Sequence, residues 1–375
     1  MASPGTKKSS KVYFAGLRAR GPKENKLSRL GKLFETAGFK RLAGEGLLAA
    51  VKLHFGELGN DTFISPVLVR AIVDKLKKYG AKPFLTDTGT LYSGSRHNAV
   101  DHLGTASLHG FTPETVGAPV LIADGLRGND WREVKVGLKH FKAVKIASAV
   151  LDADSLLVVS HFKGHEMAGF GGAIKNLAMG CAPAAGKRDQ HSPRFKVGQG
   201  KCVGCAECLK VCPQKAISLA EKKAQVDPKL CIGCGECLTV CKTKALYMDW
   251  ETEIGPFTEK MVEYAYGAVK GRRAKTGYFN FLVNITPDCD CVSWSDAPIV
   301  PDIGILASSD PVAIDKACLD LVNRQAGLAG TLLAENLAPG EHKFQGLWKH
   351  TQSALQLSYA EEIGLGQQDY ELLEI

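Results

Sequence analysis

Eight of the twelve cysteines lie within forty residues, in two copies of one spacing pattern. Each copy reads CxxCxxCxxxC, a spacing in which three thiolates cover one face of a cubane iron-sulfur cluster while the fourth points to a second cluster. The spacing therefore predicts two [4Fe-4S] clusters. We expect the first to be held by Cys202, Cys205, Cys208 and Cys241, and the second by Cys231, Cys234, Cys237 and Cys212.

The chain around the two cysteine motifs also repeats. CVGCAECLKVCPQKAISL (202–219) matches CIGCGECLTVCKTKALYM (231–248), and each copy closes with a short apolar strand. Zinc normally takes its four ligands from two separated CxxC pairs, so it does not explain this repeat. Lys242 replaces the proline found at 213, which should alter the second turn without abolishing ligation. We expect a bacterial-type ferredoxin module over residues 196–250.

Composition limits the partners that the chain can have. The net charge is +8, and residues 1–41 hold eleven Lys and Arg against two acids, but these are spread along the segment and form no basic patch interleaved with aromatic residues, as a nucleic-acid surface would need. Residues 196–250 hold nine Lys against five acids, which would attract a small acidic electron carrier such as a ferredoxin or flavodoxin; a merely soluble surface is the alternative.

Cysteines at metal-ligand spacing indicate a reducing compartment. Without an apolar run of about 18 residues or a signal peptide, we expect a cytoplasmic protein that spans no membrane.

Both sides of the cysteine motifs show α/β patterning. Short apolar runs typical of buried strands occur at residues 11–17, 46–55, 81–88, 154–162, 280–286 and 302–308. Helical patterns occur at 65–80, 259–271 and after Asp310, where Asp310 suits an N-cap, Pro311 the first turn and Asp315 the positive end of the helix dipole. This alternation predicts an α/β fold with a mixed, largely parallel sheet, formed by residues 1–195 and 251–375 and interrupted by the inserted module.

Polar residues follow four of the predicted strands. They are His54, Gly56 and Glu57; Asp87 and Thr88; His161, Lys163 and His165; and Asp288, Cys289, Asp290 and Cys291. Functional groups gather at the carboxyl ends of parallel strands, so these residues predict a pocket at one sheet edge.

The run SHFKGHEMAGFGGAIKNLAMG (160–180) is dense in glycine and carries His165 and Lys175. It matches neither GxxxxGK[ST] nor GxGxxG, which weighs against nucleotide binding. Two interpretations remain open: the wall of a functional pocket, in which Lys175 is a nucleophile or an anion binder, and a turn that packs against the inserted module. His161 and His165 have the spacing of a helical metal pair, but the glycines disfavour a helix.

The close pair Cys289 and Cys291 suggests further chemistry. Two thiolates this near each other can bind a metal, or with Cys181 can pass electrons or protons to a substrate. The alternative is a pair of reduced thiols in a packed turn. Cys318, within the last helical pattern, is expected to lie in the core.

Six segments in order carry a resemblance to a known family: VKLHFGELGN, TDTGTLYSGSRHNAVDHL, SHFKGHEMAGFGGAIKNLAMGCA, the doubled cysteine motif, TPDCDC and PDIGILASSDPVAIDKA. They resemble the iron-sulfur proteins catalogued as domain of unknown function 362. The resemblance covers nearly the whole chain and implies an α/β protein with a ferredoxin insert.

A shorter segment, from His165 to His191, is similar to the nickel-pincer lactate racemases. The similarity implies an acid/base role for His165, a covalent cofactor anchor at Lys175 and metal binding by His191. It also places Gly169, Gly171 and Gly172 beside a cofactor. Ala173-Ile174 departs from that family's pattern, which has a basic residue before the lysine.

We therefore expect an oxidoreductase in which two clusters deliver electrons to a small molecule in the predicted pocket. Its catalytic candidates are His165, Lys175, His54 and Asp87, beside His191, Cys289 and Cys291. The sequence leaves open whether a further metal or a lysine-anchored cofactor is bound there. One alternative is a non-enzymatic electron carrier or assembly factor, which would need no such loop. The other is a racemase or isomerase of the nickel-pincer type, which would need no electron path.

Overall fold

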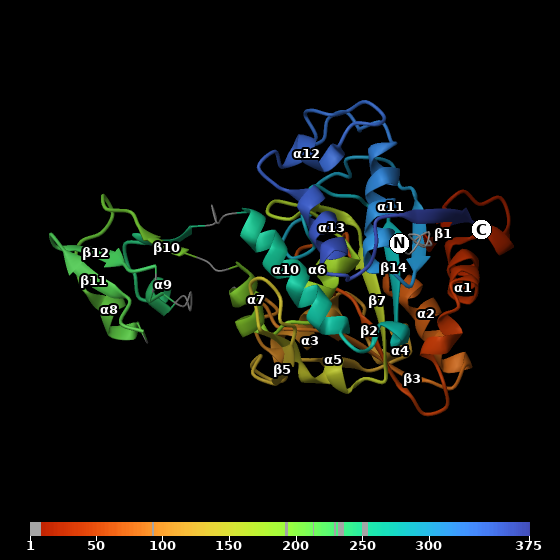
Figure 1. The fold of residues 1–375 in the computed structure, drawn as a ribbon, viewed down its shortest axis with the longest axis horizontal. Helices are drawn as coiled ribbons and strands as arrows, with labels where there is room; N and C mark the ends of the chain where they lie inside the picture. Colours follow the sequence, from red (N-terminus) through yellow and green to blue (C-terminus); the bar gives the residue numbers. More distant parts are fainter. Residues whose placement is uncertain are drawn as a thin grey trace, which may run out of the picture.

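The computed structural model describes residues 9–91, 94–191, 194–212, 214–228, 230–231, 236–249 and 254–375. Its main element is an eight-stranded sheet in the order β16-β1-β15-β14-β7-β2-β3-β4 (Figure 1). These strands are β1 (Ser10–Gly16), β2 (Leu48–Lys52), β3 (Lys82–Asp87), β4 (Val120–Ile122), β7 (Ser155–His161), β14 (Thr276–Leu282), β15 (Gly304–Ser308) and β16 (Tyr370–Glu374). All neighbouring pairs are parallel except the two made by β15. The mixed, largely parallel sheet predicted from the sequence is confirmed.

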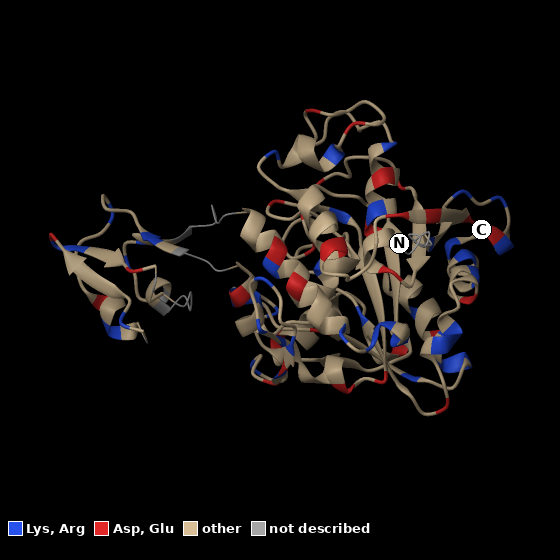
Figure 2. Cartoon of the chain, viewed as in Figure 1, with Lys and Arg blue, Asp and Glu red and all other residues tan. Residues whose placement is uncertain are grey.

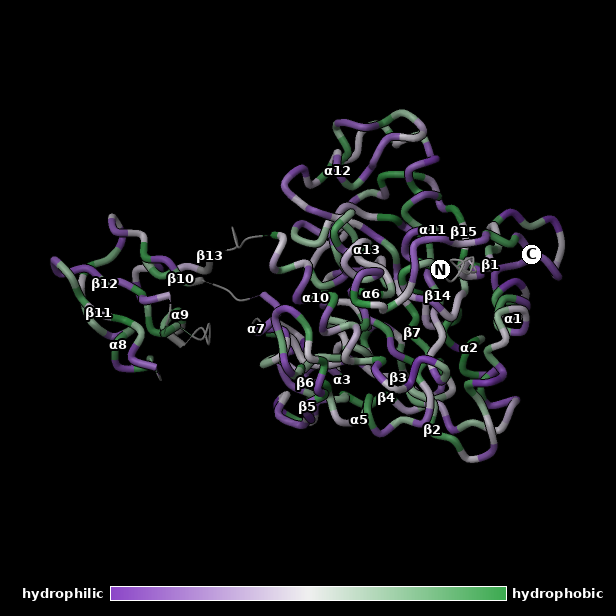
Figure 3. Tube along the Cα trace, viewed as in Figure 1, coloured by the Kyte–Doolittle hydropathy of each residue, from purple (hydrophilic) through white to green (hydrophobic). Residues whose placement is uncertain are grey.

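Helices cover both faces of the sheet. Successive residues of each strand point to opposite sides, so each strand has apolar side chains to bury on both faces. In β7, Leu157 and Val159 pack with α1 (Lys26–Thr36) and α2 (Pro66–Lys78). Leu156 and Val158 pack with α6 (Ala173–Ala178), α10 (Ile254–Val269), α11 (Pro311–Asn323) and α13 (Ser353–Glu362). Burial of both faces explains the continuous apolar strands, which are green in the middle of the body (Figure 3).

Shorter elements complete the body. They are η1 (Pro22–Glu24), η2 (Phe39–Leu42), α3 (Ala99–Leu108), α4 (Pro113–Val116), α5 (Ser148–Asp152), α7 (Ala184–His191), η3 (Arg273–Lys275), α12 (Lys343–Leu347) and the strand pairs β5 (Trp131–Lys135) with β6 (Ala143–Ala147) and β8 (Lys163–His165) with β9 (Gly169–Gly171).

Two local predictions can be compared with the structure in detail. Asp310 caps α11, since its Oδ1 accepts from Val312 N at 2.8 Å and from Ala313 N at 3.1 Å, as predicted. The strand predicted at 280–286 is observed earlier, at Thr276–Leu282, where its backbone pairs with β7. The chain leaves the sheet at Asn284, whose φ of +48° is incompatible with a strand.

The glycine-dense run 160–180 is regular structure rather than an open loop. It forms the end of β7, the β8–β9 pair and α6. Asp315 of α11 caps α6 by accepting from Ala173 N at 2.7 Å and Ile174 N at 2.9 Å, so its role is at a neighbouring helix rather than its own. A Cβ at Gly172 would lie 2.3 Å from Asp315 Oδ1, so this close approach requires glycine.

Residues 194–249 form a small region with its own apolar cluster, which includes Phe195, Ile217 and Leu246. Its elements are β10 (Arg194–Val197) paired with β13 (Leu246–Asp249), β11 (Ile217–Ala220) paired with β12 (Lys223–Val226), α8 (Glu207–Val211) and α9 (Glu236–Thr239). The apolar strands predicted after the two cysteine motifs appear as β11 and β13. Figure 1 shows this region on the side of the body where α7 ends and α10 begins.

The basic residues that the structure describes between residues 9 and 41 lie largely on solvated surface, and Lys7 and Lys8 lie outside the described residues. In α1, Leu30, Leu33 and Phe34 are buried, whereas Lys26 and Lys32 are exposed. In Figure 2, Lys and Arg residues, drawn in blue, alternate with residues of other kinds along α1 and α2. In the part of the chain that the structure describes, no helix combines the length and apolarity needed to cross a membrane.

Candidate functional site

A cavity of about 630 Å³ opens at the carboxyl ends of β2 and β3 and beside the segments that follow β7 and β14. These four strands are neighbours and parallel, so their carboxyl ends share one edge. The cavity brings together the predicted residues His54, Asp87, His165, Lys175, His191, Cys289 and Cys291. Trp294, about half exposed, also lines it.

The three glycines predicted beside a cofactor pack against protein atoms. A Cβ at Gly169 would lie 2.7 Å from Ser353 Cβ, and one at Gly171 would lie 3.3 Å from Lys175 Cδ. Gly172 abuts Asp315, as described above. Their spacing is accounted for by the packing of β9 and α6.

Asp87 ends β3 and forms a buried ion pair with Lys52 Nζ at 2.9 Å. Burial raises the pKa of Asp87, but Lys52 and the other nearby cations outweigh it and hold the pKa well below its usual range. Lys52 Nζ also donates to Asn176 Oδ1 at 2.7 Å, and Asn176 Nδ2 donates to Val159 O at 3.1 Å. Asn176 thus joins α6 to β2 and β7, which fixes the direction of the adjacent Lys175. A lysine inside the apolar run LLAAVKLHF was the sequence signal for this pair.

A second charged network lies beside Asp87. Buried Arg96 donates from Nε to Glu57 Oε2 at 2.9 Å, and its NH1 lies 3.0 Å from His54 Nε2 and 3.9 Å from Asp87 Oδ2. His54 Nδ1 accepts from Gly56 N at 2.9 Å. Burial lowers the pKa of His54 well below its usual value, and Arg96 lowers it further. His54 is therefore neutral, and Arg96, absent from the sequence-predicted site, is the fixed cation of this wall.

His165 is held as a neutral imidazole whose Nε2–H is available as a hydrogen-bond donor. Its Nδ1 accepts from Met167 N at 3.1 Å and from Ala168 N at 3.2 Å. A backbone N–H can only donate, so the proton of the neutral ring must sit on Nε2. Burial lowers the pKa of His165 well below its usual value, and the Lys175 ammonium lowers it further. The Nε2–H of His165 can therefore donate a hydrogen bond, and Nε2 has no free lone pair for a substrate proton.

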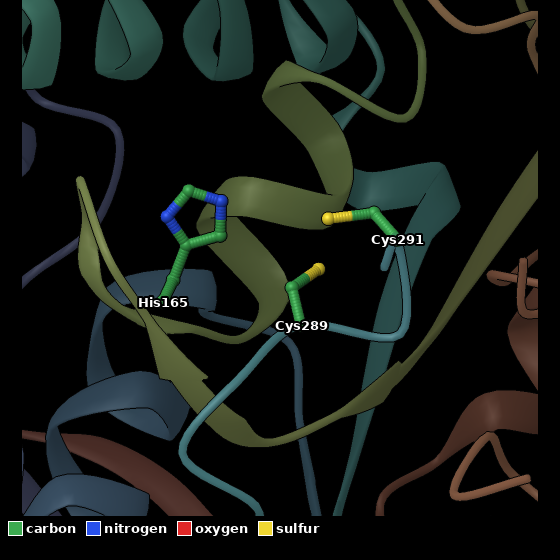
Figure 4. A group of neighbouring side chains, drawn as sticks. All are labelled: His165, Cys289 and Cys291. Carbon is green, nitrogen blue, oxygen red and sulfur yellow. The ribbon is translucent and has the colours of Figure 1, made fainter. Parts of the chain in front are cut away.

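Cys289, Cys291 and His165 face one another across the cavity wall (Figure 4). Their sulfur and nitrogen atoms all lie within 4.8 Å of one another, and Lys175 Nζ donates to Cys289 Sγ at 3.4 Å. The hydrogen bond from Cys291 lowers the pKa of Cys289; burial opposes this shift, but the Lys175 ammonium helps to hold the pKa well below its usual value. Burial lowers the pKa of Lys175, but the Cys289 charge outweighs it, so the pKa is raised. This ion pair favours an ammonium at Lys175 rather than an amine nucleophile.

Lys187 of α7 also lines the cavity, but its pKa is shifted in the direction opposite to that of Lys175. Its Nζ donates to Thr88 Oγ1 at 2.5 Å and to Ala182 O at 2.7 Å. Burial lowers the pKa of Lys187 to about 8, although Asp124 and Asp87 favour the charged form. The sequence analysis did not identify Lys187; its position one helical turn before His191 was the available signal.

The two lysines should differ in reactivity toward an amine-selective reagent such as acetic anhydride. Near pH 8 about half of Lys187 is neutral, whereas Lys175 stays protonated, so Lys187 should be acylated at least about tenfold faster. Peptide mass spectrometry between about pH 7 and 9 would measure both rates. The rate at Lys187 should rise with pH, with its midpoint near 8. Equal rates at the two lysines would contradict this assignment.

His161 and Asp290 hold the wall in place from behind. His161 Nδ1 lies 2.8 Å from Asp290 Oδ1, and its Nε2 lies 2.9 Å from Val283 O. Asp290 therefore points into the interior while its neighbours Cys289 and Cys291 point into the cavity. The His161–His165 metal pair does not form, because His161 is occupied by these contacts. Cys181 and Cys318 lie in the apolar core, Cys318 as predicted.

The small region brings together the four cysteines predicted for the first cluster. Cys202, Cys205, Cys208 and Cys241 line one small cavity whose other walls are largely apolar, including Val203, Leu219 and Val240. Ala224 N donates to Cys202 Sγ at 3.4 Å, and Ala245 N donates to Cys241 Sγ at 3.2 Å. Four sulfur donors with backbone N–H support in an apolar pocket fit the requirements of an iron-sulfur cluster.

The second quartet is described in part. Ala216 N donates to Cys212 Sγ at 3.2 Å, the counterpart of the Ala245–Cys241 hydrogen bond in the other copy of the motif. Cys231 and Cys237 pack in the same apolar cluster. Cys234 lies outside the described residues.

Two solved structures are similar to this chain, with low sequence identity and low TM-scores. The lactate racemase apoprotein from Thermoanaerobacterium thermosaccharolyticum is 13% identical, with 76% of this chain and 53% of that chain covered and a TM-score of 0.36. A protein from Thermotoga maritima is 10% identical, with 76% and 57% covered and a TM-score of 0.34. The chain thus spans about half the length of these proteins. No curated protein matches the chain.

The strongest comparison is with a protein family. The family described as "Domain of unknown function (DUF362)" matches residues 49–320, which include the strands β3, β7 and β14, all of β2 except Leu48, and every charged, histidine and cysteine residue of the cavity. The match spans well over half of the chain, and the chain belongs to the DUF362 family.

Proposed function

We propose that this chain is an iron-sulfur oxidoreductase that exchanges electrons with a small molecule bound in the cavity of the α/β body. The observation that carries the proposal is how the small region is attached. α7 ends at His191 and α10 begins at Ile254, so the insertion leaves and re-enters the body between these helices. His191 and Phe257, one from each helix, both line the cavity, and their ring centroids are 5.1 Å apart. An inserted electron-transfer module would thus be joined to the body at the cavity wall.

The cysteines would hold two [4Fe-4S] clusters in the pairing predicted from their spacing, with residues 196–250 as the ferredoxin-type module. When bound, such clusters carry electrons one at a time over a wide range of potentials. The fit of the first quartet to one apolar, sulfur-lined cavity supports this assignment. The excess of lysines over acids in residues 196–250 would steer a small acidic carrier to this surface, so the reduction rate by ferredoxin or flavodoxin should fall as ionic strength rises.

The cavity residues would bind and orient the small molecule and supply protons. Lys175, as an ammonium, and His165, as an Nε2–H donor, would bind an oxygen that gains negative charge. Lys187, with a pKa of about 8, can exchange a proton near neutral pH. Asp87, His54 and Arg96 are tied into one charged wall that positions the substrate rather than titrating with it.

One observation favours a second candidate, a racemase or isomerase of the nickel-pincer type. His165, Lys175 and His191 converge on one cavity, as that resemblance requires. Two features weigh against it. The Nε2 of neutral His165 already carries its proton, so it is a poor general base, and Lys175 is paired with a thiolate, which disfavours a covalent anchor there. The non-enzymatic alternative, an electron carrier or assembly factor that catalyses no reaction, would give the buried Lys175–Cys289 pair no function.

The decisive experiment is purification without oxygen followed by metal analysis and electron paramagnetic resonance. The proposal predicts about eight irons per chain, reducible cluster signals and no stoichiometric nickel. Lys175→Ala and His191→Ala should retain the iron but lose the response of the clusters to small molecules added as oxidants. Stoichiometric nickel with little iron would overturn the proposal in favour of the second candidate. Clusters whose response to added small molecules is the same in both variants as in the parent would favour a simple carrier.

A further inference from the structure

Cys289 is surrounded by groups that can donate a hydrogen bond to its sulfur. Lys175 Nζ lies 3.4 Å from Sγ, and an ammonium has no lone pair with which to accept. His165 lies on another side with its ligand atom within 4.8 Å, and its Nε2 carries the ring proton because Nδ1 accepts two backbone N–H groups. The Cys291 thiol lies within the same 4.8 Å. With the Lys175 ammonium and the His165 Nε2–H as donors on two sides, the sulfur of Cys289 is an acceptor, an arrangement that favours the thiolate over the thiol.

The side chain is also placed where a small molecule can reach it. Only 2% of Cys289 is solvent-accessible, and the residue forms part of the wall of the cavity of about 630 Å³. Its direction is fixed by the neighbouring residue. Asp290 is anchored behind the wall by His161 and by Glu57 N, which donates to Asp290 O at 2.9 Å. A buried, oriented thiolate at the wall of a large cavity has the features of a covalent nucleophile.

A soft divalent metal is the competing occupant of the same three atoms. A histidine that binds a metal through Nε2 normally has its proton on Nδ1 and donates it to an acceptor. Here Nδ1 faces two backbone N–H donors, so a neutral His165 offers no lone pair at Nε2. The Lys175 ammonium at 3.4 Å would in addition repel a cation bound to Cys289 Sγ. The hydrogen bonds therefore favour a free thiolate over a metal ligand.

We propose that Cys289 is a nucleophile that captures a small carbonyl compound in the cavity, with Lys175 and His165 binding the carbonyl oxygen. A sulfur lone pair of Cys289 forms the C–S bond, and the carbonyl π pair moves to the oxygen. That oxygen takes a proton from the Lys175 ammonium, which leaves a thiohemiacetal and a neutral amine. Addition is reversible, and nothing is oxidised or reduced in this step. The inference deepens the proposed function because it names the substrate class, an aldehyde or reactive ketone.

The test uses the full-length protein, purified without oxygen and with its clusters in place. Iodoacetamide is added with and without a short aliphatic aldehyde, and alkylation of each cysteine is followed by peptide mass spectrometry. Cys289 should react at least about tenfold faster than Cys181 and Cys318, because burial raises the pKa of both reference thiols. The aldehyde should slow alkylation of Cys289 and leave the reference cysteines unchanged.

Variants separate the nucleophile from a merely accessible thiol. Lys175→Met removes the charge-assisted hydrogen bond and should slow alkylation of Cys289 about tenfold, whereas Lys175→Arg, which keeps the charge, should restore most of the rate. Cys289→Ser should abolish the label at that position. Equal rates at Cys289 and the reference thiols, or a Lys175→Met protein that reacts as fast as the parent, would overturn the proposal. So would stoichiometric zinc that keeps Cys289 unreactive.

Cluster signals recorded on the same samples keep this inference distinct from the proposed function. Electron paramagnetic resonance of the Cys289→Ser protein should match the parent, because this cysteine is not among the predicted cluster ligands. Full cluster signals with an unreactive Cys289 would remove the nucleophile and leave the redox function standing. If Cys289 is reactive and protected by the aldehyde but the protein shows no cluster signals, the redox function falls and the nucleophile stands.

Discussion

Replacing Cys241 with alanine should remove about four of roughly eight irons per chain, because it takes away the fourth thiolate that we propose for the first cluster. Cys241 belongs to the second cysteine motif in the sequence but lines the cavity of Cys202, Cys205 and Cys208 in the structure. Iron analysis and spin quantitation would measure the loss. Cys318→Ala, which removes a buried thiol from the core of the body, is the matched control and should retain all of the iron.

Double variants test the pairing itself. Cys208→Ala with Cys241→Ala should damage only the first cluster and retain about half of the iron, since both ligands belong to one site. Cys208→Ala with Cys212→Ala should damage both clusters and lose nearly all of it. If each motif held its own cluster, these two results would be exchanged. The comparison therefore distinguishes crossed from contiguous ligation without a new structure.

Replacing Lys52 with methionine should lower the free energy of unfolding by about 3–5 kcal/mol, the usual cost of leaving a buried charge unpaired. Lys52 and Asp87 are 1% and 3% exposed and 2.9 Å apart, and the substitution would leave Arg96, 3.9 Å from Asp87, as the nearest remaining cation of this ion-pair network. Chemical denaturation of protein with intact clusters, followed by tryptophan fluorescence, would measure the change.

The partner variant provides the control. Adding Asp87→Asn to Lys52→Met removes the orphaned charge and should recover most of the lost stability. The folded-state pKa of Asp87 lies below its unfolded value, so its contribution is present above about pH 4 and declines as the pH falls. The difference between parent and Asp87→Asn should therefore shrink on acidification. A loss below about 1 kcal/mol in Lys52→Met would show that the pair is not what holds this wall.

Several features of the fold were accessible from the sequence because they depend on neighbours along the chain. The apolar runs of β2, β3 and β7 are buried on both faces, which makes their patterns strong. The Asp310 cap of α11 involves residues two and three positions away. β14 was placed too late because its start, Thr276–Phe279, has a weaker apolar pattern and is defined by pairing with β7. The antiparallel direction of β15 likewise depends on its partners in space.

Some features of the candidate site were likewise predictable from the sequence, and others were not. Grouping His54, Asp87, His165 and Cys289 required only the rule that parallel strands end at one edge. The sequence could not identify Lys187 as the low-pKa lysine, since this depends on its burial beside Thr88. The resemblance to the racemases implied an acid/base role for His165, whereas the direction of Nδ1 toward two backbone donors makes its Nε2–H a hydrogen-bond donor.

By itself the sequence determined the cysteine spacing, the α/β alternation and the edge at which polar residues collect, because each is written in residues close together along the chain. The tertiary structure alone decided what Lys175 is. A lysine in a glycine-rich segment could be an amine nucleophile or an ammonium, and the choice depends on Cys289, more than a hundred residues away in sequence and 3.4 Å away in space. Proton positions follow from such contacts, since hydrogen bonding and burial act over a few ångströms of space rather than along the chain.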